Sequence, residues 1–184
     1  SDEHLRKAYF EDYMEIGGIP DYVLHGEISY LKELVDDILQ KDIIAFYGVK
    51  DSGILKDYFL LLMERAGKVL SINKIANILG ISPDSAKRYL SMFENSYLIH
   101  LIARYGKTNE RLLSAKKIYA ADLGIRVLFT GFRDKGSLFE NYVYLKLRKE
   151  NPSYVYKDMI EIDFITEGKK IIEVKYDSQM TEKQ

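Results

Sequence analysis

Residues 160–176 read Ile-Glu-Ile-Asp-Phe-Ile-Thr-Glu-Gly-Lys-Lys-Ile-Ile-Glu-Val-Lys-Tyr, and the fold of the C-terminal part of the chain depends on this stretch. Apolar and polar residues alternate over 160–166 and again over 170–176, a pattern typical of two β-strands. Gly168 lies between the two segments, where the chain must turn. The sequence therefore predicts a β-hairpin.

The register of this hairpin decides whether its charged side chains meet. Because side chains alternate between the two faces of a strand, Asp163 and Glu173 share a face only in certain registers. They do so if Thr166 faces Lys170 around a three-residue turn in which Gly168 takes a positive φ. A two-residue turn would put Glu173 on the other face. We predict the odd-length turn, or an equivalent bulge.

Two carboxylates that face each other at about 5 Å across a strand pair repel unless a cation lies between them. Mg²⁺ and Mn²⁺ prefer such oxygen ligands and can hold a water molecule or a substrate phosphate. Asp163 and Glu173 are therefore candidate metal ligands. The alternative is two solvated strands with outward charges and a surface Glu–Lys pair that contributes little to stability.

The spacing of Asp163 and the Glu173-x-Lys175 run resembles the core motif of PD-(D/E)xK nucleases. The resemblance implies that Asp163 and Glu173 ligate a divalent metal and that Lys175 stabilises charge or positions water. Such folds often add an acidic residue from the preceding helix, and Glu140 matches that position. Glu140 also fits a capping box with Ser137 as the helix N-cap, which would explain it without any chemistry.

Composition limits the kinds of protein that this chain can be. Its 184 residues, 47% hydrophobic and 30% charged, suffice for one larger or two small domains. No apolar run is long enough to span a bilayer, and nothing resembles a signal peptide. The absence of cysteine excludes disulfides and thiolate sites, and the three histidines are too widely spread for a zinc site. We expect a soluble cytoplasmic protein that does not contact membranes.

Charge is unevenly distributed along the chain. Residues 1–60 carry 6 basic and 13 acidic side chains, whereas residues 61–120 carry 10 basic and 4 acidic ones. A basic middle third suggests that any contact with nucleic acid is made there.

The first sixty residues predict a small helical unit. Residues 2–15 have helical spacing, and the run Gly17-Gly18-Ile19-Pro20 ends that helix. Helical spacing returns over 29–40, with Ser29 as its N-cap, and a strongly apolar helix follows and ends near Gly67. Asp122, further along the chain, is expected to cap a short helix.

The middle third predicts a winged helix-turn-helix. A helix capped by Ser71 stops at Gly80, and a second helix starts at Ser82-Pro83. Strands at 97–102 and 116–120 would form the wing. The side chains expected at DNA, mainly on phosphates, are Ser85, Lys87, Arg88, Ser91, Arg104, Lys107 and Arg111. Such modules also serve as protein contacts, and Lys87 and Arg88 could simply be a solvated face.

Several motifs together are similar to the C-terminal region of a prokaryotic and archaeal family of AAA+ ATPases. In chain order they are Gly17-Gly18-Ile19-Pro20, Asp42-Ile43-Ile44, residues 71–90, Lys117-Ile118-Tyr119, Asp122-Leu123-Gly124, Glu140-Asn141, residues 161–164 and Glu173-Val174-Lys175. The resemblance implies a winged helix followed by a nuclease-like fold. No Gly-x-x-x-x-Gly-Lys-Ser/Thr motif occurs, so we expect a fragment that lacks the ATPase core and does not bind or hydrolyse ATP.

We therefore predict an α+β protein with a helical unit over 1–66, a winged helix-turn-helix over 67–120 and a nuclease-like α/β domain over 121–184, possibly truncated. Its expected role is the DNA-binding region of an AAA+ ATPase that binds Mg²⁺ or Mn²⁺ and cleaves DNA. The alternatives are a non-catalytic module for DNA or protein contacts, and a region that docks on its own ATPase core.

Overall fold

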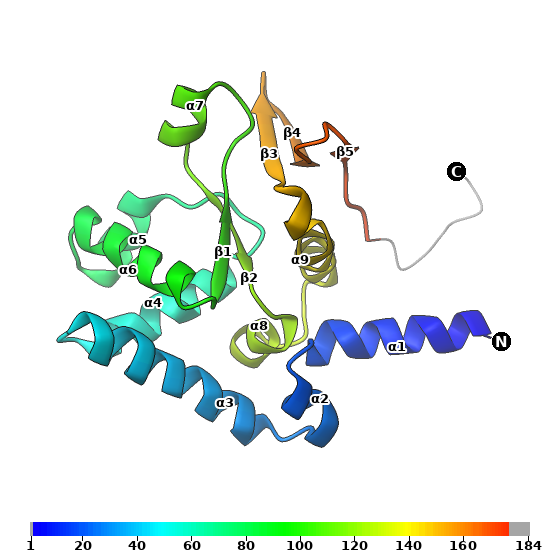
Figure 1. Cartoon of the computed structure of the whole chain (residues 1–184), viewed down its shortest axis with the longest axis horizontal. Helices are drawn as coiled ribbons and strands as arrows, with labels where there is room; N and C mark the ends of the chain where they lie inside the picture. Colours follow the sequence, from blue (N-terminus) through cyan, green and yellow to red (C-terminus); the bar gives the residue numbers. More distant parts are fainter. Residues whose placement is uncertain (1, 177–184) are drawn as a thin grey trace.

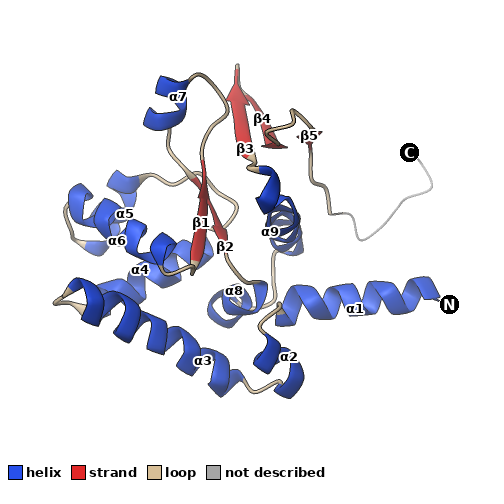
Figure 2. Cartoon of the chain, in the orientation of Figure 1, coloured by secondary structure: helices blue, strands red, loops and turns tan. Residues whose placement is uncertain are grey.

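The computed structural model describes residues 2–176, which form a mixed α+β structure with small antiparallel sheets (Figures 1 and 2). The end of the chain from Asp177, which the nuclease-like unit was predicted to include, lies outside the described residues. No helix between residues 2 and 176 is both long and apolar enough to cross a membrane.

Helices make up the first part of the chain and surround the strands in the rest. They are α1 (Asp2–Ile16), α2 (Pro20–His25), α3 (Ile28–Asp37), a π-helical segment (Ile38–Ala45), α4 (Ser52–Glu64), α5 (Ile72–Leu79), α6 (Pro83–Asn95), α7 (Thr108–Leu113), α8 (Leu123–Thr130), α9 (Lys135–Leu147) and a 3-10 turn (Arg148–Glu150). The prediction of Ser29 as an N-cap is wrong, because α3 begins one residue before it and follows Glu27, whose side chain makes no capping hydrogen bond.

Asp122 joins the end of α1 to the start of α8. One of its carboxylate oxygens accepts the N–H of Ile125 at 3.0 Å, which confirms the predicted cap, and the other accepts the N–H of Gly18 at 2.8 Å. Gly17 has a φ of 77°, and a Cβ at this position would lie 2.5 Å from both Asp122 Oδ1 and the nitrogen of Gly124. Only glycine fits this approach.

The helix pair α5–α6 begins and ends where the sequence predicts. The hydroxyl of Ser71 accepts the N–H of Lys74 at 3.4 Å, and Gly80 ends α5 with a φ of 65°. The hydroxyl of Ser82 accepts the N–H of Ser85 at 3.1 Å, with proline at the first helical position. These capping residues fix a sharp turn between the two helices.

Two strands follow the helix pair, as predicted, and link it to the C-terminal sheet. β1 (Ile99–Ile102) pairs antiparallel with β2 (Lys117–Ala120), and Val69 forms a further bridge to the start of β2. Their connection contains α7, which the sequence did not predict. Within this connection the N–H of Tyr105 donates to the carbonyl of Tyr154 at 2.7 Å, which holds the connection against β3.

β3 (Ser153–Lys157), β4 (Ile160–Ile165) and β5 (Ile171–Ile172) form the C-terminal sheet. Phe164 faces Ile172, and the N–H of Thr166 donates to the carbonyl of Lys170 at 3.0 Å, which confirms the predicted register. The positive φ of the turn was assigned to the wrong residue, because it falls on Lys169 (64°) rather than on the glycine before it. The second strand is also shorter than predicted.

β2 has a different core on each face. Ile118 and Ala120 pack among the helices around α4 and α6. Tyr119, on the opposite face, packs with Tyr144 and Phe164, and its ring stacks on that of Tyr144 at a centroid distance of 4.4 Å. The strand is therefore shared by the helical part and the C-terminal sheet.

The close approach at Gly17 generates a testable prediction. Gly17→Ala should lower the free energy of unfolding by well over ~1 kcal/mol, because it combines a left-handed φ with a clash. Gly26→Ala is the matched control, since Gly26 also has a positive φ (67°) but no atom within 4 Å of an added Cβ. Urea denaturation of both variants checks this, and equal losses would contradict it.

Candidate functional site

A buried lysine lies at the start of β2. Alternation along the strand places Lys117 on the same face as Tyr119, toward the C-terminal sheet. The side chain of Lys117 is only 2% exposed. A buried ammonium group is costly without partners, so we expect acidic side chains that neutralise it.

Three carboxylates surround the ammonium group of Lys117. Glu140 on α9 places Oε1 at 3.0 Å from Nζ, and Glu161 on β4 places Oε1 at 3.1 Å. Asp163, two residues further along β4, places Oδ1 at 3.8 Å. The side chains of Glu140 and Asp163 are 18% and 16% exposed, whereas that of Glu161 is half exposed. We call these four residues the lysine–carboxylate cluster.

Two neighbours of the cluster fix the position of Glu140. Asn141, which is fully buried, bonds to the backbone of Ala120 through both halves of its amide, accepting the N–H and donating to the carbonyl at 3.0 Å each. The amide of Asn141 thereby joins α9 to the backbone of β2. The hydroxyl of Tyr119 donates to Oε1 of Glu140 at 2.7 Å.

The start of α9 corrects the prediction made for Glu140. Asp134, not Ser137, is the N-cap, and its carboxylate accepts the N–H of Ser137 at 3.2 Å. The hydroxyl of Ser137 instead accepts from Arg126 and donates to the carbonyl of Ala66. Glu140 therefore takes no part in a capping box and is free to face Lys117.

The carboxylates keep Lys117 charged in spite of its burial. Burial by itself lowers the pKa of the ammonium group, but the charge and hydrogen bond of Glu140, followed by those of Glu161, outweigh it and leave the pKa above the usual lysine value. The pKa of the Tyr119 hydroxyl is raised by burial and then by Glu140. The cluster is thus an ammonium ion and a neutral phenol that both donate to carboxylates.

The structure brings together only part of the predicted catalytic set. Glu140 and Asp163 meet around Lys117, whereas Glu173 and Lys175 are exposed and form no side-chain hydrogen bond or ion pair with any other residue of 2–176. One step beyond the last strand pair, the register would put Glu173 opposite Asp163. Pairing stops there because Oδ2 of Asp163 accepts the N–H of Val174 at 2.8 Å, in place of a ladder bond.

Sequence reasoning missed three members of this site. Glu161 entered only through the motif of residues 161–164 and was given no role. Lys117 and Tyr119 were noted only as part of a resemblance. One signal could have found Lys117 and Tyr119, namely that they alternate with apolar residues in a short strand. A lysine at a buried position of such a strand needs a nearby acid.

The centre of the lysine–carboxylate cluster is occupied by an ammonium group rather than left open for a divalent metal. Within residues 2–176 no three histidine, aspartate or glutamate side chains are disposed to hold a metal ion. The oxygens of Glu140 and Asp163 that face inward surround Lys117, and the other oxygen of Asp163 already accepts a backbone N–H. A cation of any kind at this point would meet the ammonium group.

The residues predicted to contact DNA lie on two elements. Lys87, Arg88 and Ser91 are exposed on α6, whereas Ser85 is half-buried and its hydroxyl is bonded to that of Ser82 at 3.0 Å. A groove of about 810 Å³ runs between α6 and the segment after α7, and its lining includes Lys87, Ser91, Leu112, Leu113 and Lys116. Arg104 is half-buried, and Lys107 and Arg111 are exposed at α7.

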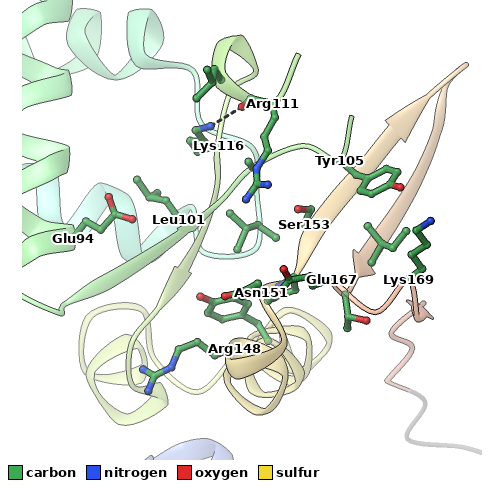
Figure 3. A pocket seen from close by; sticks show the side chains of 17 residues that line it. Glu94, Leu101, Tyr105, Arg111, Lys116, Arg148, Asn151, Ser153, Glu167 and Lys169 are labelled. Carbon is green, nitrogen blue, oxygen red and sulfur yellow. Dashed lines mark hydrogen bonds between the residues drawn. The ribbon is translucent and has the colours of Figure 1, made fainter. Parts of the chain in front are cut away.

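A second hollow, a cleft of about 640 Å³, lies on the other side of α7, between β1 and the C-terminal sheet (Figure 3). Its basic side chains are Arg111, Lys116, Arg148 and Lys169. Burial lowers the pKa of Lys116, with Arg111 adding to the effect, and raises the pKa of Glu94 across the cleft. The groove and the cleft share Leu112 and Lys116, so basic side chains continue around α7.

Comparison with known proteins identifies relatives but no activity. Residues 7–136 match a family described as a domain of unknown function, DUF8612. An uncharacterized protein of Methanocaldococcus jannaschii is 28% identical over 193 aligned positions, and one of Haemophilus influenzae is 30% identical over 189. Each alignment covers 96% of this chain but only 44% and 47% of the relative, so the chain spans less than half of these proteins. No solved structure matches the chain significantly.

Removal of the Lys117 charge should destabilise the fold. Lys117→Met leaves Glu140 and Asp163 without their cation, and breaking such a buried pair typically costs about 3 kcal/mol. The control Lys56→Met removes an ion pair of similar length (3.1 Å, to Asp36) whose side chains are both about half exposed, and should cost under ~1 kcal/mol. Urea denaturation at neutral pH measures both, and a smaller loss for Lys117→Met would contradict the assignment.

The raised pKa of Lys117 also sets the sign of a pH effect. Its contribution to stability is fully present below the ordinary lysine pKa and is lost as the pH rises through the higher value of the folded state. The stability gap between wild type and Lys117→Met should therefore narrow as the pH rises through the alkaline range, which urea denaturation over a pH series measures.

Proposed function

Because the chain belongs to the DUF8612 family, described as a domain of unknown function, its own geometry is the guide to its role, and we propose that it is a DNA-binding region. The observation that carries the proposal is the exposure of Lys87 and Arg88 on α6, the second helix of a capped helix pair. No carboxylate of residues 2–176 forms an ion pair with either side chain, so both are available to phosphates.

In this proposal α4, α5 and α6 with β1 and β2 act as a winged helix. The connection between the two strands takes the place of the wing and carries Arg104, Lys107 and Arg111. The basic side chains that continue around α7 support this role, because a duplex lying on α6 would pass along the groove beside Lys87. These contacts go to the phosphates of the DNA, so they fix the position of the duplex and do not read its sequence.

The second part of the proposal is that α9 and the C-terminal sheet form a nuclease-like unit that is structural rather than catalytic. It is supported by the lysine–carboxylate cluster, in which Glu140 and Asp163 are already neutralised by Lys117. An AAA+ ATPase core is the partner that we propose. The longer relatives have room for such a core, since each is more than twice as long as the matched region.

DNA binding is tested with the double variant Lys87→Ala, Arg88→Ala. Its affinity for a duplex of random sequence should fall about tenfold near 0.1 M salt. The slope of log affinity against log salt should become shallower by about 2, because two phosphate contacts are lost. Fluorescence anisotropy over a salt series measures both quantities.

The matched control is Arg6→Ala, Lys7→Ala, which removes an equally exposed basic pair from α1. It should leave both the affinity and the salt slope close to wild type. Equal losses in the two double variants, or no binding by the wild type, would reject the proposed DNA surface.

A metal-dependent deoxyribonuclease is the second candidate function, with Mg²⁺ or Mn²⁺ at Asp163 and Glu173 and with Glu140 and Lys175 beside it. The hairpin register favours it, because the next residue pair along the strands would be Asp163 and Glu173. Under this candidate, nicking of supercoiled DNA in Mn²⁺ should fall by more than ~100-fold in Glu173→Gln and should persist in the exposed control Glu150→Gln. Absence of Mn²⁺-dependent nicking by the wild type would reject it.

A further inference from the structure

We propose that the ammonium group of Lys117 is the built-in cation of the carboxylate cluster and excludes a divalent metal from it. This inference does not depend on DNA binding, because it concerns only β2, α9 and β4. It rests on where Nζ lies, on how firmly it is held there, and on what remains free on the carboxylates around it.

The ammonium group lies at the point where the carboxylates converge. Nζ is within hydrogen-bond distance of Glu140 and Glu161, at 3.0 and 3.1 Å, and faces Asp163 at 3.8 Å. These side chains come from a helix and a strand that are separated from Lys117 by 23 or more positions in the sequence. A cation at their centre offsets the repulsion that three neighbouring carboxylates would otherwise feel.

Lys117 is held at this point by the strand that carries it and not by its side chain alone. Its backbone is paired on both sides, with Ile102 of β1 and with Val69. The side chain is 2% exposed, so it is packed against its neighbours rather than extended into solvent. It is therefore unlike a surface lysine, which could swing aside when a metal arrives.

The carboxylate oxygens have little left to offer a metal. Oε1 of Glu140 accepts from Lys117 and from the hydroxyl of Tyr119, and Oδ2 of Asp163 accepts the N–H of Val174. Mg²⁺ and Mn²⁺ need several oxygens at about 2.1 Å, whereas Oε1 of Glu140 and Oε1 of Glu161 already lie 3.0 and 3.1 Å from the positive charge of Lys117. Metal and ammonium cannot both occupy the cluster.

The decisive experiment is a gain of metal binding. Titration with MnCl₂, followed by electron paramagnetic resonance of free Mn²⁺, should show no specific site in the wild-type chain. Lys117→Met should bind one Mn²⁺ at least tenfold more tightly, because it leaves the carboxylates without their cation. Adding Asp163→Asn to this variant should abolish the new site.

The control is Lys157→Met, which removes an exposed lysine of β3 in the same sheet. It should bind Mn²⁺ no better than wild type. A wild-type site that is lost in Asp163→Asn would overturn the proposal, and so would a folded Lys117→Met that gains no site. If circular dichroism shows that Lys117→Met is unfolded, the comparison of wild type with Asp163→Asn decides alone, since binding by neither supports the proposal.

Discussion

The requirement to neutralise the buried Lys117 ammonium governs how the parts of this chain come together. β2 delivers the charge, and α9 and β4 must each supply a carboxylate before the sheet can close over it. Because an unpaired buried charge costs several kcal/mol, arrangements in which α9 or β4 slips by one residue are strongly disfavoured. The ion cluster therefore contributes more to the uniqueness of the fold than to its stability.

Asn141 on α9 and Tyr119 on β2 both help to bring Glu140 to the Lys117 ammonium. The amide of Asn141 substitutes for a peptide group beside Ala120, which sets both the height and the rotation of α9 on β2. Tyr119 stacks on Tyr144 of the same helix and bonds to Glu140. These contacts of Asn141 and Tyr119 fix α9 on β2, and they place Glu140 of this helix within 3.0 Å of Lys117.

Local patterns in the sequence were sufficient for most of the longer helices and for the hairpin register, but not for α7 or for the short second strand of the hairpin. Alternation left two hairpin registers open, and the one that we predicted, with Thr166 facing Lys170, is observed and pairs Phe164 with Ile172. Capping residues located α5 and α6. Patterns failed where two neighbours are equally suited to a task, as with Asp134 and Ser137 at the start of α9.

The candidate site was only half predictable, for a different reason. Strand alternation pointed to Asp163 and the resemblance to Glu140. Their partner is Lys117, which lies 44 residues before Glu161, and no local pattern in the sequence pairs it with these acids. Glu173 and Lys175 were grouped with the site by spacing, yet the bond from Val174 to Asp163 ends the ladder before them. Only tertiary geometry decides which charges meet.

The two faces of β2 bear on how the chain can be divided. Cutting after Ala120 would free the α5–α6 helix pair with β1 and β2, but the freed piece would carry Lys117 and Tyr119 on its surface, without their acid and aromatic neighbours. The remaining piece would hold Glu140 and Asp163 with no cation. The helical part and the C-terminal sheet are thus one cooperative unit, and a recombination or domain exchange that separates them at this strand would yield two unstable halves.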